Sequence, residues 1–115
     1  MSRHLRILQA NLRKMPETQY SVLNDETYKD YGLLMITEPR VVRFDQGEWQ
    51  VTPQQHSTWI PVQPKYEGRE RRPRAMIWVH KDIQFQELET GSRDAVAVMI
   101  KVGGETIVAL SVYVG

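Results

Sequence analysis

A carboxylate follows an unbroken apolar run in the first third of the sequence. Leu33 to Ile36 carry no polar side chain, and Thr37, Glu38 and Pro39 come directly after them. Such a run is typical of a strand buried on both faces, and Pro39 cannot continue a central strand because it lacks an N–H. Open α/β sheets expose their sites where strands end. Glu38 is therefore predicted to present a carboxylate at the rim of a sheet.

Asn11 is the second side chain placed for chemistry. The segment LRILQAN predicts a strand that ends near Asn11. Strand, helix and buried strand in so short a span indicate a βαβ unit, whose strands are parallel and end at the same edge. Asn11 and Glu38 would then lie within reach of one ion or water. Each has an ordinary alternative, since an Asn at a strand end often forms a turn and a Glu at a rim is often solvated.

The element that joins these strands is predicted to be a helix over residues 17–28. Pro16 and Glu17 suit a first helical turn, and Tyr20 and Leu23 have the spacing of a buried face. Gly32 supplies the stop.

A basic segment covers residues 65–74, with the sequence KYEGRERRPR. Clustered Lys and Arg are typical of contacts with a phosphate backbone, and a Tyr is available for stacking. A solvated loop with partly compensated charge is the alternative. The candidate nucleic-acid-binding residues are Lys65, Tyr66, Arg69, Arg71, Arg72 and Arg74.

The remaining patterns predict strands. Residues 40–55 look like a long connection, and strands are expected at 56–62, 75–79 and 83–88. Gly103-Gly104 separates residues 95–102 from 105–114, which indicates an antiparallel hairpin. Tyr113 arrives at the end of its second strand.

Composition sets the class of protein. The chain has 115 residues, a formal net charge of +1 and no cysteine, which excludes disulfides, thiolate metal sites and thiol nucleophiles. No signal peptide is recognisable, and nowhere do about eighteen apolar residues run together, so neither secretion nor a membrane partner is expected. We expect a soluble intracellular protein of one domain.

Three segments in order carry a resemblance to a known family: LRILQAN, then LLMITEPR, then SVYVG. Together they resemble the N-terminal half of the endonuclease/exonuclease/phosphatase superfamily, which has the deoxyribonuclease I-like fold. The endonuclease domains of fungal LINE-like non-LTR retrotransposons are the most similar members. The resemblance implies an α/β (α+β) fold. It would be the N-terminal half of a four-layer αββα sandwich, with one mixed sheet, one or two flanking helices and a C-terminal antiparallel hairpin.

The resemblance also implies a chemistry, namely Mg²⁺-dependent nicking of DNA, with Mn²⁺ as a substitute. Glu38 would hold the metal, Asn11 would orient the metal or a phosphate, and Tyr113 would contact the scissile phosphate. Oxygen ligands of this kind are those Mg²⁺ prefers. Ser111 stands where the family usually has Asn.

The sequence departs from the family in what it lacks. It contains neither the G-D-F-N motif nor the terminal S-D-H motif, and His4, His56 and His80 lie in no such motif. A positioned general base contributes about a hundredfold or more, so the chain alone is expected to be inactive. Residues 1–115 are interpreted as a single partial domain whose C-terminal half is missing. A retrotransposon origin would make the location nuclear.

A half-domain would leave part of a sheet uncovered. We expect the face that carries Val96, Val98 and Ile100 to need a partner, either a C-terminal half-domain or a second copy. Two alternatives stay open: a non-catalytic nucleic-acid-binding or partner-completing module that uses the basic segment, and a decayed remnant without activity.

Overall fold

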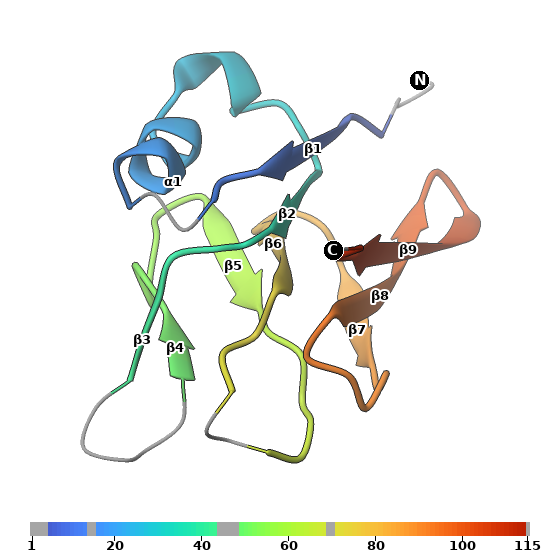
Figure 1. Cartoon of the computed structure of the whole chain (residues 1–115). Coiled ribbons are helices and arrows are strands. Elements are labelled where there is room, and N and C mark those ends of the chain that lie inside the picture. The colour runs from blue at the N-terminus through green and yellow to red at the C-terminus, as the bar shows by residue number, and fades with distance from the viewer. Residues whose placement is uncertain (1–4, 14–15, 44–48, 69–70, 115) are drawn as a thin grey trace.

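The strands and helices were assigned on a computed structural model that describes residues 5–13, 16–43, 49–68 and 71–114 (Figure 1). Helical turns occur only near the N-terminus of this part, in α1 (Pro16–Leu23) and the short 3₁₀ helix η1 (Glu26–Tyr28). The strands are β1 (Ile7–Asn11), β2 (Leu33–Thr37), β3 (Val41–Arg43), β4 (Trp49–Val51), β5 (Trp59–Val62), β6 (Ala75–His80), β7 (Phe85–Leu88), β8 (Ala95–Val102) and β9 (Glu105–Val112). The chain is thus a mixed α and β structure, as predicted.

A four-stranded mixed sheet, in the order β1-β2-β6-β5, forms the centre of the molecule. β1 and β2 run parallel, with Asn11 opposite Thr37, and β6 runs antiparallel to both β2 and β5. The predicted parallel pair around the first helix is therefore confirmed. β5 is an edge strand, and Pro61 is tolerated there because one side of an edge strand needs no N–H donor for a neighbouring strand.

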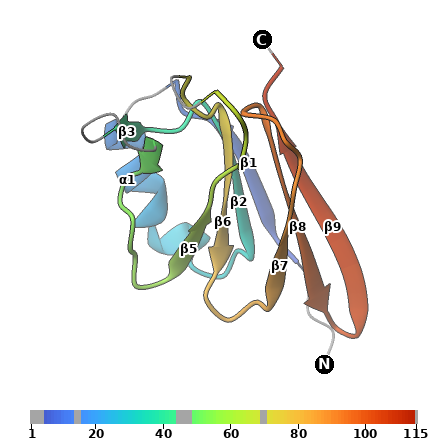
Figure 2. The same cartoon turned by 90° about the horizontal axis from the view of Figure 1, so that it is seen from below.

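The last three strands form a second, antiparallel sheet in the order β7-β8-β9. The predicted hairpin is confirmed, since β8 and β9 pair from Ala95 opposite Val112 to Val102 opposite Glu105. This sheet packs face to face on the first one, and one apolar cluster joins their facing side chains. Figure 2 shows the two sheets as adjacent layers.

The prediction of an uncovered face at Val96, Val98 and Ile100 is wrong. These side chains are 3%, 0% and 0% exposed, because they pack against β2 and β6 of the first sheet. The prediction assumed a single sheet, whereas the structure has a four-stranded and a three-stranded sheet packed face to face, beside the two-stranded β3–β4 sheet. The uncovered apolar surface is instead the opposite face of β9, where Val108 and Leu110 are 59% and 52% exposed.

α1 and the β3–β4 hairpin cover the other face of the four-stranded sheet (Figures 1 and 2). Their apolar side chains join a second cluster around Met76 and Trp78. The predicted helix over 17–28 is too long, because α1 ends at Leu23 and the Asp25 side chain accepts a hydrogen bond from the Thr27 N–H (2.8 Å) to start η1. No helix in the described ranges is long and apolar enough to cross a membrane.

The residue that anchors α1 is Gln19, not the predicted Tyr20. Gln19 is 1% exposed while Tyr20 is 42% exposed. The Gln19 amide accepts a hydrogen bond from the Arg40 N–H (2.8 Å) and donates to the carbonyls of Arg40 and Thr52. These bonds fix the β3–β4 hairpin to the helix. The region predicted as a long connection therefore holds two short strands whose three-residue lengths give no periodic pattern.

Candidate active site

Strand ends from both sheets meet at one rim of the molecule. β1 and β2 are parallel and end there, so β6, which is antiparallel to β2, begins there. This edge of the first sheet holds Asn11, Glu38 and Arg74. β8 begins and β9 ends at the same rim, which adds Asp94 and Tyr113.

Backbone hydrogen bonds tie these ends together across the two sheets. The Glu38 N–H donates to the Arg74 carbonyl (2.9 Å), and the Arg74 N–H donates to the Arg93 carbonyl (2.7 Å). The Tyr113 N–H donates to the Asp94 carbonyl (2.8 Å). These bonds link the end of β2 to the end of β9 through Arg74 and residues 93–94, so the backbone holds the predicted residues Glu38 and Tyr113 in place.

Glu38 has a left-handed backbone with φ of 50°, and its side chain is only partly buried. This conformation costs a residue with a Cβ roughly 1–2 kcal/mol. The buried Pro39 follows Glu38 directly, and the Glu38 N–H donates a hydrogen bond to the Arg74 carbonyl. Strain of this kind gathers at functional sites, where the surrounding structure maintains it.

Asn11 is exposed, and its Oδ1 accepts a hydrogen bond from the Arg13 N–H (2.9 Å). It lines a cleft of about 400 Å³ between β1 and β9, together with Thr37 from β2 and the buried Ser111 from β9. The cleft lies between β1 and β9, which are the edge strands of the two sheets. It therefore extends from Asn11 to the strand that ends next to Tyr113.

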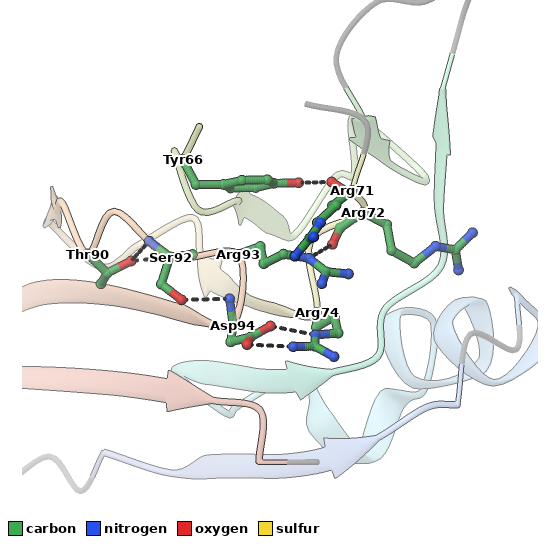
Figure 3. A network of polar contacts seen from close by, with 8 residues as sticks. All are labelled: Tyr66, Arg71, Arg72, Arg74, Thr90, Ser92, Arg93 and Asp94. Atoms are coloured by element: carbon green, nitrogen blue, oxygen red, sulfur yellow. Dashed lines mark hydrogen bonds and ion pairs between the residues drawn. The ribbon is translucent and has the colours of Figure 1, made fainter. Parts of the chain in front are cut away.

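Arg74 and Asp94 form a bidentate ion pair at the rim (Figure 3). Arg74 Nε lies 2.5 Å from Asp94 Oδ1, and its terminal nitrogen Nη2 lies 2.6 Å from Oδ2. The guanidinium carbon also lies 4.7 Å from the centre of the Tyr113 ring. A bidentate pair with a ring beneath it fixes the guanidinium plane, so Arg74 connects the start of β6, the start of β8 and the end of β9.

The fold of the chain has a counterpart among solved structures. One solved structure, the endonuclease domain of TRAS1, a telomere-specific non-LTR retrotransposon, matches over 97% of the chain with a TM-score of 0.69 and 20% sequence identity. The chain has the deoxyribonuclease I-like fold. It spans 45% of the length of the TRAS1 endonuclease domain. Scans against protein-family models and against curated protein sequences gave no match.

Within this deoxyribonuclease I-like fold, the rim supplies one unpaired carboxylate. Glu38 has no ion pair among the described residues, whereas the Asp94 carboxylate is occupied by Arg74. No group of three or more His, Asp or Glu side chains placed to hold a metal occurs in the described ranges. Mg²⁺ is commonly bound by one or two carboxylates, with water and substrate phosphate completing its shell. The Glu38 carboxylate and the Asn11 amide oxygen are ligands of the type that Mg²⁺ accepts, and they stand at the ends of neighbouring parallel strands.

The same pair shifts two pKa values in opposite directions. The hydrogen bonds from Arg74 lower the pKa of Asp94, and those bonds in turn raise the pKa of Arg74. Both side chains are about one-third exposed, so solvent screens their attraction. The ion pair therefore serves chiefly as a geometric brace.

The structure gives different surroundings to the basic residues of 65–74. Lys65 is exposed and lies 3.6 Å from Glu87, and the Tyr66 hydroxyl donates to the Arg71 carbonyl (2.5 Å). Arg71 is exposed, and the Arg72 guanidinium stacks on Trp49 at 5.2 Å. Arg74 is held by Asp94 as described above, and Arg69 lies outside the described residues.

Two histidines have structural contacts. His56 accepts from the Thr58 N–H (3.0 Å) through Nδ1, so its Nε2 faces Asn24 Oδ1 (3.0 Å) as a donor, and burial lowers its pKa. His80 Nδ1 accepts from the Asp82 N–H (3.1 Å), and its ring packs edge-on against Trp59. His4 lies outside the described residues.

Asp94 and Trp49 are the rim and near-rim residues that sequence reasoning missed. Asp94 directly precedes a predicted strand whose antiparallel partner ends at Tyr113, so strand direction alone would have placed it at the rim. Trp49 lies in β4, which has no recognisable sequence pattern.

Proposed function

We propose that this chain is the part of a divalent-metal-dependent DNA endonuclease that carries Asn11, Glu38 and Tyr113. The observation that supports it is the meeting of these residues at one rim of a deoxyribonuclease I-like fold. The similar structure is an endonuclease domain by its own description.

The positions of Glu38, Asn11 and Tyr113 at the rim suggest a separate role for each of them. Glu38 and Asn11 would hold Mg²⁺, or Mn²⁺ in its place, because they end neighbouring parallel strands and offer oxygen ligands. The metal would stabilise the charge on the phosphoryl oxygens. Tyr113, braced by Arg74, would contact the scissile phosphate.

The chain alone is proposed to be inactive. It lacks the G-D-F-N and S-D-H motifs, and it spans less than half of the TRAS1 domain. Residues 1–115 would then form a single partial domain. A partner that carries the missing motifs would complete the site by covering the open face of the β7–β9 sheet. Action on chromosomal DNA would place the protein in the nucleus.

The test is nicking of supercoiled plasmid with Mg²⁺, by the chain alone and mixed with a fragment that carries the two motifs. We expect nicking only in the mixture, and a loss of about a hundredfold or more in Glu38→Gln. Glu26→Gln is the matched control, because Glu26 is an exposed carboxylate of η1 whose ion-pair partner in the described ranges is Lys29. Absence of nicking in the mixture, or equal rates in both variants, would overturn the proposal.

A second function has its own supporting observation. β5 ends at the rim where β6 begins, and the Glu38 N–H donates to the carbonyl of Arg74, the last cation of the basic segment. A non-catalytic DNA-binding module would retain DNA without metal, and this retention would survive Glu38→Gln while weakening steeply with salt.

A further inference from the structure

A cleft of about 500 Å³ lies between the β3–β4 hairpin and the segment that follows β5. Trp49 and Tyr66 give it aromatic walls, and Gln50 and Gln54 add side-chain amides. Lys65 and Glu87, which face each other at 3.6 Å, also line it.

Two arginines flank the Trp49 wall. Arg43 is opposite Trp49 in the hairpin register, with its guanidinium carbon 5.9 Å from the ring centre. Arg72 approaches from the other segment at 5.2 Å. The Arg72 carbonyl accepts from Arg93 Nε (2.7 Å), as Figure 3 shows, so its backbone is fixed as well. Ring contacts of this kind hold a guanidinium in place without neutralising its charge.

The cleft is also braced from within. The Gln63 amide accepts from the Val51 N–H (2.8 Å) and donates to the Trp49 carbonyl (2.9 Å), which joins the segment after β5 to β4. The Tyr66 hydroxyl donates to the Arg71 carbonyl and closes the basic segment on itself. A ligand would therefore meet a formed site and pay little for ordering it.

We propose that this cleft binds a single strand of DNA. An unpaired base would lie between the walls formed by Trp49 and Tyr66, and the adjoining phosphates would contact Arg72 and Arg43. Aromatic walls accept the flat face of any base, whereas the bases of an intact duplex remain stacked on one another. The amides of Gln50 and Gln54 offer both donors and acceptors to a base edge.

Charge and location support the same ligand. Arg43 and Arg72 place two guanidinium groups at the ring of Trp49, which lines the cleft, while the acidic Glu87 is opposed by Lys65. The inference rests on the proposed function, because it takes DNA as the substrate. It adds a site for a strand that is locally unpaired, separate from the metal-binding residues.

The experiment measures fluorescence anisotropy of a labelled mixed-sequence oligonucleotide, single-stranded or annealed, in about 50 mM salt with EDTA. The chain is compared with Trp49→Leu, Arg72→Gln and the control Lys101→Gln. Lys101 is an exposed cation near the Gly103-Gly104 turn, at the end of β8 away from the rim. We expect the single strand to bind more tightly than the duplex. Each cleft variant should weaken single-strand binding about tenfold, and the control should leave it unchanged.

Thermal unfolding of each variant accompanies the titration, and the surface change Arg72→Gln keeps the test valid if Trp49→Leu fails to fold. Unchanged single-strand binding in the folded variants would overturn the proposal, as would equal losses for single strand and duplex. The assay contains no metal and involves no cleavage. A failure of nicking alone would leave single-strand binding intact, so the two proposals fail separately.

Discussion

Glu38 combines three properties. It follows a strand whose first four residues are buried, it has a positive φ of 50°, and its carboxylate has no ion-pair partner in the described ranges. A residue selected only for stability at this position would be glycine, which adopts positive φ without steric cost. The presence of a glutamate there is consistent with a carboxylate retained for chemistry.

The strain at position 38 is testable by two substitutions that both remove the carboxylate. Glu38→Gly should unfold with a free energy about 1 kcal/mol higher than Glu38→Ala, since only alanine retains the left-handed penalty. Urea denaturation of the two variants measures the difference. Equal stabilities would show that residue 38 does not hold this conformation in solution.

Residues at strand ends were predictable because apolar runs and turn formers mark where strands stop. Asn11 and Glu38 follow such runs, and their adjacency came from the parallel connection alone. Strand direction alone would have placed Asp94 at the rim, but its pairing with Arg74 is a long-range contact that the sequence does not show, and the same holds for the contact of Trp49 with Arg72. Likewise, Gln19 is polar in sequence but its bonds to Arg40 and Thr52 make it a core residue.

At the scale of elements, the Arg74–Asp94 pair joins the start of β6 to the start of β8 and so holds the two sheets in register at the rim. Because the pKa of Asp94 is lowered in the folded state, the pair's stabilisation is present above the unfolded pKa of about 4. It is lost as the pH falls through the lower folded pKa.

Asp94→Asn should therefore be less stable than the unaltered chain at pH 7, and this difference should shrink below about pH 4. Thermal unfolding of both proteins from pH 7 to pH 2 measures it. Glu26→Gln removes a fully surface pair, Glu26 with Lys29 (3.4 Å), and should change stability little at any pH. A difference for Asp94→Asn that does not change with pH would show that the ionised pair is not the cause.

The longer strands were predictable from the sequence, and the shortest ones were not. The five-residue β2 and the eight-residue β8 and β9 have clear patterns, and their pairing directions were predicted correctly. The assignment of strands to sheets was not predictable, because the nearly continuous apolar run of β8 indicates that the strand is buried but not which sheet covers it. The short β3 and β4 owe their place to Gln19 and to the buried Val41 and Val51.

At the scale of the molecule, the described residues form three layers, where the resemblance implied half of a four-layer αββα sandwich. Helix and hairpin cover the first sheet and the first sheet covers the inner face of the second, but the described residues leave the outer face of β7–β9 open (Figure 2). β9 is also an edge strand, so its outer hydrogen-bonding groups have no strand partner in the described ranges. An apolar face beside an open edge is a surface that association would cover.

We therefore expect the chain to associate through β9, with a larger apparent mass than the 13.4 kDa of one chain. Leu110→Lys places a charge at the centre of the open face, where Leu110 is 52% exposed, and should shift the protein toward monomer without unfolding it. Light scattering after size-exclusion chromatography measures the mass across a range of concentrations. Tyr20→Lys is the matched control and should leave the mass unchanged. Tyr20 is also exposed (42%), but it lies on α1, on the opposite side of the molecule from the open face of β9. A monomer at every concentration would mean that the outer face of β9 is tolerated in water and that completion of the fold needs no partner there.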